Sequence, residues 1–325
     1  MQNSPLVSII TPCHNSRSFI HRLLDSILEQ TYPNIEMYAM DNASKDDTAD
    51  IIKSYIPRFA QRGYSLKYIL EEDLGPSGAV QNALGLIKGD YLVMPDSDDW
   101  YAEKDSIEKY VNIFESLSDD YAIVRAQLQH VRESDMEKLD LIYANFPEDD
   151  PGTLFEDCLF GKNNYCYAPI NYMVKVSKLR EMTGMSIYNA YNTGQQRQIC
   201  LPLYYKYKAW TISEPLACYL VRESSISHGD YSKYPTQKVL YYKSINYIES
   251  ILKTIDSMPD LDKTKYRNAF MRQSAMRILM LSLRCNKTED VCGYIKDYRR
   301  FGGGYDVFFT ILKFKTKLFL KNLFV

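Results

Sequence analysis

The sequence lacks the features that mark several classes of protein. Its seven cysteines are scattered, odd in number and never spaced as Cys-x-x-Cys, which argues against a disulfide framework or a zinc site and favours a reducing, cytoplasmic compartment. No window of the sequence reaches the roughly 20 uncharged residues of a membrane-spanning helix. The start of the chain has no basic region and its first apolar run is short, so we expect no signal peptide.

The charge of the chain is nearly balanced. Its 39 basic and 41 acidic residues leave a net charge of −2, which gives no sign of a nucleic-acid partner. The 325 residues suffice for one large domain with an appendage or for two domains. The 28 tyrosines suit sugar and nucleotide binding, although ordinary packing explains such an excess equally well.

Short apolar segments alternate with segments whose apolar residues recur at helical spacing. We expect strands at 7–10, 35–40 and 66–70, and helices at 18–30, 46–55 and 79–87. This alternation predicts an α/β fold with a parallel sheet and right-handed crossovers. Ligands of such sheets bind at the carboxyl ends of the strands, so His14, Asp41 and Asp98 should converge.

The most informative segment, 89–100, is an apolar strand that ends in Asp96, Asp98 and Asp99. Neighbouring carboxylates repel one another and lose solvation when they are brought to one strand end. A fold that gathers them there usually supplies a cation or solvent to balance the charge. The segment therefore predicts a site for a metal ion and a diphosphate.

The chain is less regular after Trp100. We expect helices at 106–117 and 195–207, strands at 121–125, 171–177 and 210–212, and a polar excursion at 133–151 that serves as a mobile acceptor loop. Residues 236–300 have helical character only. We therefore predict two domains, 1–229 and 230–325.

Five segments in this order resemble the inverting nucleotide-sugar glycosyltransferases of family 2, of the type that builds bacterial surface polysaccharides. The segments are Val7–Asn15, Ser26–Tyr32, Asp41–Thr48, Gly75–Ala79 and Gly89–Asp99. The resemblance covers roughly residues 5 to 228. It implies a GT-A fold, Rossmann-like with a mostly parallel sheet flanked by helices, followed here by a C-terminal helical extension.

The resemblance also implies roles in binding a nucleotide-diphosphate sugar. The residues matched to base and sugar contacts are Thr11, Pro12, His14, Asp41, Asn42, Gly75 and Gly78. The glycines are expected to let the backbone approach the donor closely. We expect a UDP-sugar, although an amide at Asn42, where relatives often carry a carboxylate, leaves the base open.

Asp96 and Asp98 match the Asp-x-Asp element of the family. There, one carboxylate meets the ribose and the other holds Mn²⁺ or Mg²⁺ on the diphosphate. We expect Asp98 to be the metal ligand, with Asp96 beside it. A hard divalent cation suits this chemistry because the departing nucleoside diphosphate gains negative charge.

The general base is the weak point of the resemblance. Gln195 and Gln196 stand where relatives carry an acidic pair, and a neutral amide can bind an acceptor or sugar but cannot take its proton. Three explanations are open. Another residue acts as the base, the acceptor carries a group that ionises easily or provides its own base, or the chain binds nucleotide sugars without turnover. The candidate bases are His228, Glu223, Asp230, Asp157 and Asp99.

The C-terminal segment 308–325 contains five phenylalanines, four lysines and no acidic residue. Such a segment suits the anionic inner face of a membrane, or it packs as a terminal helix on protein. The membrane interpretation favours a peripheral protein with a polyprenyl-linked saccharide as acceptor.

The sequence as a whole predicts a metal-dependent inverting transferase that passes a sugar to a saccharide acceptor in capsule, O-antigen or exopolysaccharide assembly. The main alternative is a catalytically silent relative that binds nucleotide sugars as a scaffold. A nucleotidyltransferase is disfavoured, because the first loop, 11–18, has no glycine and one arginine.

Overall fold

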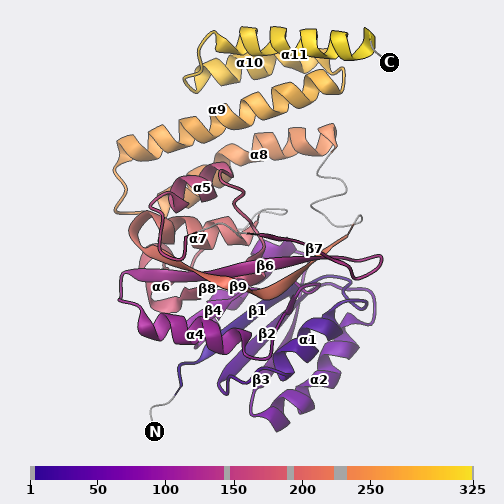
Figure 1. The fold of residues 1–325 in the computed structure, drawn as a ribbon, viewed down its shortest axis with the longest axis vertical. Helices are drawn as coiled ribbons and strands as arrows, with labels where there is room; N and C mark the ends of the chain where they lie inside the picture. The colour runs from indigo at the N-terminus through magenta and orange to yellow at the C-terminus, as the bar shows by residue number, and fades with distance from the viewer. Residues whose placement is uncertain (1–3, 143–146, 189–193, 223–232, 324–325) are drawn as a thin grey trace. The chain divides into compact units, whose positions relative to one another are not determined.

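The computed structural model describes residues 4–142, 147–188, 194–222 and 233–323 (Figure 1). The chain divides into two compact units, Met1–Arg222 and Glu223–Val325, which we describe separately. The domain boundary predicted at 229/230 lies in 223–232, outside the described residues, and stays a prediction.

The first unit is built on one sheet, to which nine strands of the described residues belong in the order β3-β2-β1-β4-β8-β6-β9-β5, with β7 paired to β6. Its first four strands are parallel, as predicted. They are β1 (Val7–Cys13), β2 (Ile35–Asn42), β3 (Ser65–Glu71) and β4 (Tyr91–Val93).

The remaining strands run in mixed directions. β8 is antiparallel to β4 and to β6, β9 is parallel to β6, and β5 and β7 pair antiparallel with β9 and β6. These strands are β5 (Trp100–Tyr101), β6 (Tyr121–Arg132), β7 (Lys138–Ile142), β8 (Tyr172–Lys175) and β9 (Lys208–Val221). The excursion predicted as a loop at 133–151 thus contains a strand, which extends β6 as a hairpin.

Helices cover both faces of the parallel part. Every residue of β1 and β2 is buried, as expected for strands with helices on both faces. The apolar side chains of α1, α2 and α4 join one core cluster with Val7 and Ile9 of β1. The helices of this unit are α1 (Ile20–Leu28), α2 (Thr48–Arg62), α3 (Gly75–Leu84), α4 (Ser106–Ser116), α5 (Leu154–Phe160), α6 (Val176–Thr183) and α7 (Gln195–Lys206), with a 3₁₀ turn at Pro169–Asn171.

The side of the sheet that α3 occupies follows from the strand order. The chain moves outward from β1 through β2 to β3 and then returns past both to β4. Because crossovers between parallel strands are right-handed, this reversal places α3 on the face opposite α1 and α2. The reversal lies between β1 and β4, and ligands of open α/β sheets bind at the carboxyl ends of strands at such a point.

The second unit is helical, as predicted. It contains α8 (Tyr234–Lys253), α9 (Asp260–Arg284), a 3₁₀ turn (Thr288–Asp290), α10 (Val291–Arg300) and α11 (Asp306–Leu323). Tyrosine hydroxyls connect α8 to α10: Tyr241 donates to Asp297 at 2.8 Å, and the hydroxyls of Tyr234 and Tyr294 lie 3.0 Å apart. Part of the tyrosine excess therefore serves packing. Among the described helices, none combines the length and apolar character needed to cross a bilayer.

Candidate functional site

The loops that follow β1, β2 and β4 meet at one edge of the sheet. His14 Nδ1 lies 2.6 Å from the backbone oxygen of Asn42, and the hydroxyls of Ser16 and Ser97 are 2.7 Å apart. These contacts join three segments that are far apart in the sequence. The structure thus brings His14, Asn42 and the loop that carries Asp96 and Asp98 together.

Thr11 and Pro12 are strand residues, which corrects the prediction that they lie in a loop. β1 extends to Cys13, and Thr11 has no exposed surface. At Pro12 the only described strand that pairs with β1 is β2, because β4 pairs with β1 at Val7–Ile9, and proline is found at such one-sided positions of a sheet. His14 is the first residue after the strand, and it is exposed.

Asp41 and Asn42 end β2 and are both buried. The Asp41 carboxylate accepts hydrogen bonds from the Ser44 N–H at 2.9 Å and from the Tyr68 hydroxyl at 2.8 Å. The side-chain oxygen of Asn42 is buried and has no partner within the described residues. A buried acceptor without a partner costs free energy, so this oxygen is suited to a ligand donor at the strand end.

Gly75 and Gly78 lie within α3, because this helix begins at Gly75 and not at residue 79, where the sequence predicts its start. Gly75 has a φ of +71°, a conformation that glycine adopts at no steric cost. Gly78 is buried within the helix. The expected close approach to a donor therefore has a conformational basis at Gly75 alone.

Asp98 is held by an arginine from the far end of this unit. The Arg222 guanidinium donates to Asp98 Oδ2, and its carbon lies 4.4 Å from the centre of the Phe19 ring. The two paired side chains are 21% and 17% exposed. No role was predicted for Arg222 or Phe19 from the sequence, although Arg222 follows directly after an apolar strand.

Asp96 lies beside this pair. The Gln195 amide donates to its Oδ1 at 3.3 Å. Burial, and next the charge of Asp98, raise the pKa of Asp96 from 3.8 to about 7. A raised pKa favours the protonated form of this carboxyl, and a protonated Asp96 does not repel Asp98.

Asp99 faces the protein interior, which argues against its predicted role as a base. It has no exposed surface, and its Oδ1 accepts the backbone N–H of Leu220 at 3.2 Å. Burial, followed by the charges of Asp98 and Asp96, raises its pKa well above the ordinary value. An acceptor hydroxyl cannot reach a carboxyl without accessible surface, and the contact with β9 indicates a structural role.

The two glutamines at the start of α7 have different surroundings. Gln195 contacts Asp96, as described above. Gln196 is 3% exposed and donates to the Tyr165 hydroxyl at 2.9 Å, within a cluster of aromatic rings. Only Gln195 therefore fits the predicted contact with a sugar or acceptor, whereas the amide nitrogen of Gln196 is engaged in the core.

None of the other candidate bases is seen at the sheet edge within the described residues. Glu223, His228 and Asp230 lie outside the described residues. Asp157 is buried in α5, and both of its carboxylate oxygens accept hydrogen bonds from its own segment, from Thr153 at 2.8 Å and from Asn163 at 3.0 Å.

The acid cluster fits a cation that is shared with a diphosphate. Within the described residues, no group of three or more His, Cys, Asp or Glu side chains could hold a metal by itself. Mg²⁺ sites, however, often use one or two carboxylates together with substrate phosphates. The guanidinium on Asp98 shows that this carboxylate accepts a positive charge at the strand end.

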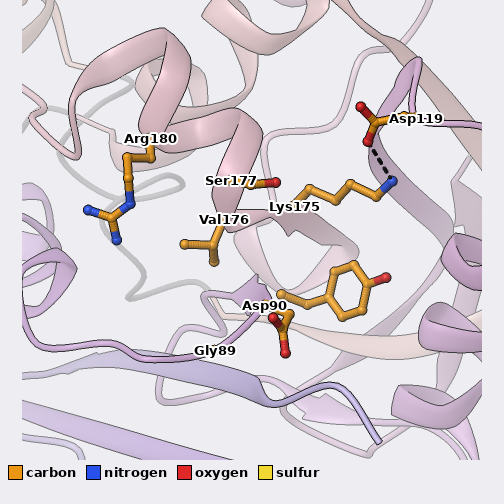
Figure 2. Close-up of a pocket in the computed structure, with 8 residues that line it drawn as sticks. Gly89, Asp90, Asp119, Lys175, Val176, Ser177 and Arg180 are labelled. Atoms are coloured by element: carbon orange, nitrogen blue, oxygen red, sulfur yellow. Dashed lines mark ion pairs between the residues drawn. The ribbon is translucent and has the colours of Figure 1, made fainter. Parts of the chain in front are cut away.

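A cavity of about 360 Å³ lies elsewhere, at the amino end of β4 (Figure 2). In Figure 2 the Lys175 side chain reaches towards Asp119, with which it forms an ion pair of 3.5 Å, and Arg180 lies on the other side. Gly89 and Asp90 line this cavity from the start of β4, whereas the acid cluster follows the end of the strand. The cavity is therefore not part of the candidate site.

The fold is of the type found in nucleotide-sugar transferases. Its marks are the partly parallel sheet, the reversal of strand order and the acid cluster after β4. Residues 8–182 match the family described as Glycosyl transferase family 2. The chain belongs to this family.

Relatives in sequence differ in how much of the chain they share. The putative teichuronic acid biosynthesis glycosyltransferase TuaG of Bacillus subtilis (strain 168) is 30% identical over 224 residues, which are 69% of this chain and 82% of TuaG. Glycosyltransferase GlyA of Streptococcus pneumoniae serotype 4 is 34% identical over 114 residues, 35% of this chain but only 16% of GlyA.

Solved structures share the fold. S. aureus TarS 1-349 in complex with UDP-GlcNAc matches with a TM-score of 0.58 and 15% identity, over 92% of this chain and 93% of TarS 1-349. The mannosyltransferase PcManGT from Pyrobaculum calidifontis, in complex with GDP-Man and Mn²⁺, matches with a TM-score of 0.51 and 14% identity, over 99% of this chain and 88% of that one. These likenesses confirm the predicted GT-A fold.

Proposed function

We propose that this protein transfers a sugar, with inversion, from a nucleotide-diphosphate sugar to a saccharide acceptor during assembly of a cell-surface polysaccharide. The observation that carries the proposal is the meeting of His14, Asn42 and the Asp96–Asp98 loop at one sheet edge. Family membership supports the transfer. The name of TuaG, which refers to teichuronic acid biosynthesis, supports the class of product.

Different residues of the proposed donor site contact different parts of the donor. His14, Asp41 and Asn42 are proposed to receive the base, Asp96 the ribose, and Asp98 a Mn²⁺ or Mg²⁺ ion shared with the diphosphate. A bound cation would neutralise the negative charge that grows on the leaving group. A UDP-sugar is the proposed donor, in keeping with the UDP-GlcNAc bound to TarS 1-349.

The transfer itself requires a proton acceptor. The acceptor oxygen bonds to the anomeric carbon as the bond to the diphosphate breaks, and the hydroxyl proton passes to the base. Gln195 contacts Asp96 and is proposed to orient a sugar or acceptor hydroxyl. His228 and Glu223 remain the proposed bases.

The membrane proposal concerns α11. Phe308, Phe309 and Leu312 are 47%, 69% and 63% exposed, and Lys313 is exposed beside them. Apolar side chains next to lysines suit an anionic bilayer surface. We propose that the protein lies peripherally on the cytoplasmic face of the membrane and acts on a polyprenyl-linked saccharide.

A second candidate function is nucleotide-sugar binding without turnover. The observation in its favour is the amide pair Gln195–Gln196 at the place of an acidic pair, with Gln195 bonded to Asp96. Both candidates predict donor binding, so only turnover separates them.

The deciding experiment incubates the protein with a panel of nucleotide sugars and Mn²⁺, with membrane extract as the acceptor source. Binding is followed by calorimetry and release of nucleoside diphosphate by a coupled assay. Release with one donor supports the transferase and identifies the sugar. Tight binding without release supports the silent relative, and the absence of binding to every donor contradicts both.

A further inference from the structure

We propose that Arg222 is the counter-ion of Asp98 in the donor-free protein and leaves it for the diphosphate when the donor binds with its cation. Arg222 thereby sets how readily a divalent cation gains access to the site. The inference rests on the proposed function, because it takes a nucleoside diphosphate and a divalent cation as the ligands.

The position of the guanidinium is specific. It donates to Asp98 Oδ2 and lies over the Phe19 ring, with 4.4 Å between the guanidinium carbon and the ring centre. An arginine over an aromatic face gains a cation–π interaction and loses little hydration. Phe19 thus holds Arg222 next to the carboxylate that we propose as the metal ligand.

The pairing puts Arg222 in competition with a cation. A guanidinium on Asp98 occupies one of the two oxygens available to a metal and repels a second positive charge. The acid cluster is thereby balanced without a metal as long as no donor is present. Removal of the guanidinium should leave Asp98 free for the cation.

The Arg222 side chain can also donate hydrogen bonds to a phosphate. The Arg222 Nε atom is buried and has no hydrogen-bond partner within the described residues. Guanidinium groups bind phosphates by two parallel N–H···O bonds, and a diphosphate shared with a cation on Asp98 would lie within the reach of this side chain. Arg222 would therefore favour the diphosphate even though it opposes the free cation.

The test measures two affinities that should change in opposite directions. Mn²⁺ binding without nucleotide is followed by the electron paramagnetic resonance signal of free Mn²⁺, and binding of UDP, with GDP as second probe, by calorimetry at saturating Mn²⁺. For Arg222→Ala we expect Mn²⁺ to bind about tenfold more tightly and the nucleotide about tenfold more weakly, the size of one charged hydrogen bond. A side chain needed only for structure would weaken both.

Two further variants keep the test decisive. Arg222→Lys retains the charge without the planar fork, so Mn²⁺ affinity should stay near that of the wild type while nucleotide affinity falls. Arg132→Ala is the control, because Arg132 pairs with Asp135 and Glu137 at an exposed position and should change neither affinity. Unchanged or weaker Mn²⁺ binding by Arg222→Ala, or unchanged nucleotide binding, overturns the inference.

Failure of the proposed function would look different. If the site does not take a nucleotide donor at all, the wild-type protein would bind neither UDP nor GDP, and if only turnover is lacking, it would bind nucleotide without releasing product in the donor-panel assay. The comparison of Mn²⁺ binding between wild type and Arg222→Ala would still decide whether Arg222 competes for Asp98.

Discussion

Among single residues, Asp98 bears most directly on the proposed donor site. Asp98→Ala should remove the Mn²⁺-dependent part of nucleotide affinity, an effect of about tenfold or more, because a charged ligand contributes on the order of 1.5–3 kcal/mol. The measurement is UDP calorimetry with Mn²⁺ and with EDTA, alongside a thermal melt to confirm folding. Nucleotide affinity that still responds to Mn²⁺ in the variant would contradict the assignment.

Asp96 makes a prediction about pH. Its folded-state pKa of about 7 lies above the ordinary 3.8, so from about pH 4 to 7 the folded protein keeps a proton that the unfolded chain has lost. The stability contributed by this group is therefore present at low pH and is lost as pH rises to about 7. Asp96→Asn cannot ionise, so its free energy of unfolding should gain on that of the wild type over this range and level off above it.

Urea unfolding at pH 4.5, 6 and 8 measures this difference. Asp119→Asn is the control, because the hydrogen bond and charge of Lys178 lower the pKa of exposed Asp119. Its contribution is lost as pH falls, so any change has the opposite sign. A free energy of unfolding of Asp96→Asn that falls relative to that of the wild type as pH rises, or that keeps a constant difference from it, would exclude the raised pKa.

Among the elements, the start of β4 is the most constrained point. A Cβ at Gly89 would lie 2.4 Å from Ser8 Oγ, 2.7 Å from Ser8 N and 2.8 Å from Leu6 O, and two of these atoms belong to the backbone. β4 would have to move away from β1, so Gly89→Ala should destabilise the protein by about 1–3 kcal/mol. Since the acid cluster follows directly after β4, nucleotide affinity should fall as well.

Gly85→Ala provides the matched comparison. A Cβ there meets no atom within 4 Å, and its φ of −76° suits any residue. Its unfolding free energy should stay within about 0.5 kcal/mol of the wild type in the same urea assay. Equal stability of the two alanine variants would show that β4 tolerates displacement.

For the whole molecule, the prediction concerns association with membranes. Full-length protein should sediment with liposomes that contain anionic lipid and not with purely zwitterionic ones, because lysines and exposed phenylalanines act together. Removal of residues 308–325 should release it. A truncated protein that still sediments, or a full-length protein that never does, would refute the proposal.

A subtler variant separates insertion from charge. Phe308→Ser with Phe309→Ser keeps every lysine while it removes two exposed rings, 47% and 69% accessible. Binding should weaken by about tenfold or more if the rings insert, given about 1.5–3 kcal/mol for each buried side chain. Unchanged liposome binding by this variant would mean that the lysine charges, and not the two rings, account for the association.

Local patterns were enough to predict the strand–helix alternation, the helical second unit and the family. β1 and β2 are buried on both faces and are mostly apolar, which marks them as strands, and the order of five short motifs is a property of the chain alone. The position of the acid cluster at a strand end followed from the same reasoning, since carboxyl ends of neighbouring parallel strands share one edge.

Local sequence patterns could not predict contacts between residues that are far apart in the chain. The contact of Arg222 with Asp98 spans 124 positions, and β7 becomes a strand only because β6 offers it an edge. Likewise, the sequence offered Asp99 as a candidate base, whereas in the structure Asp99 is buried. It gave no sign that Asp98 pairs with a guanidinium. These outcomes depend on which side chains meet in the folded chain, because solvation and charge pairing are set by neighbours in space.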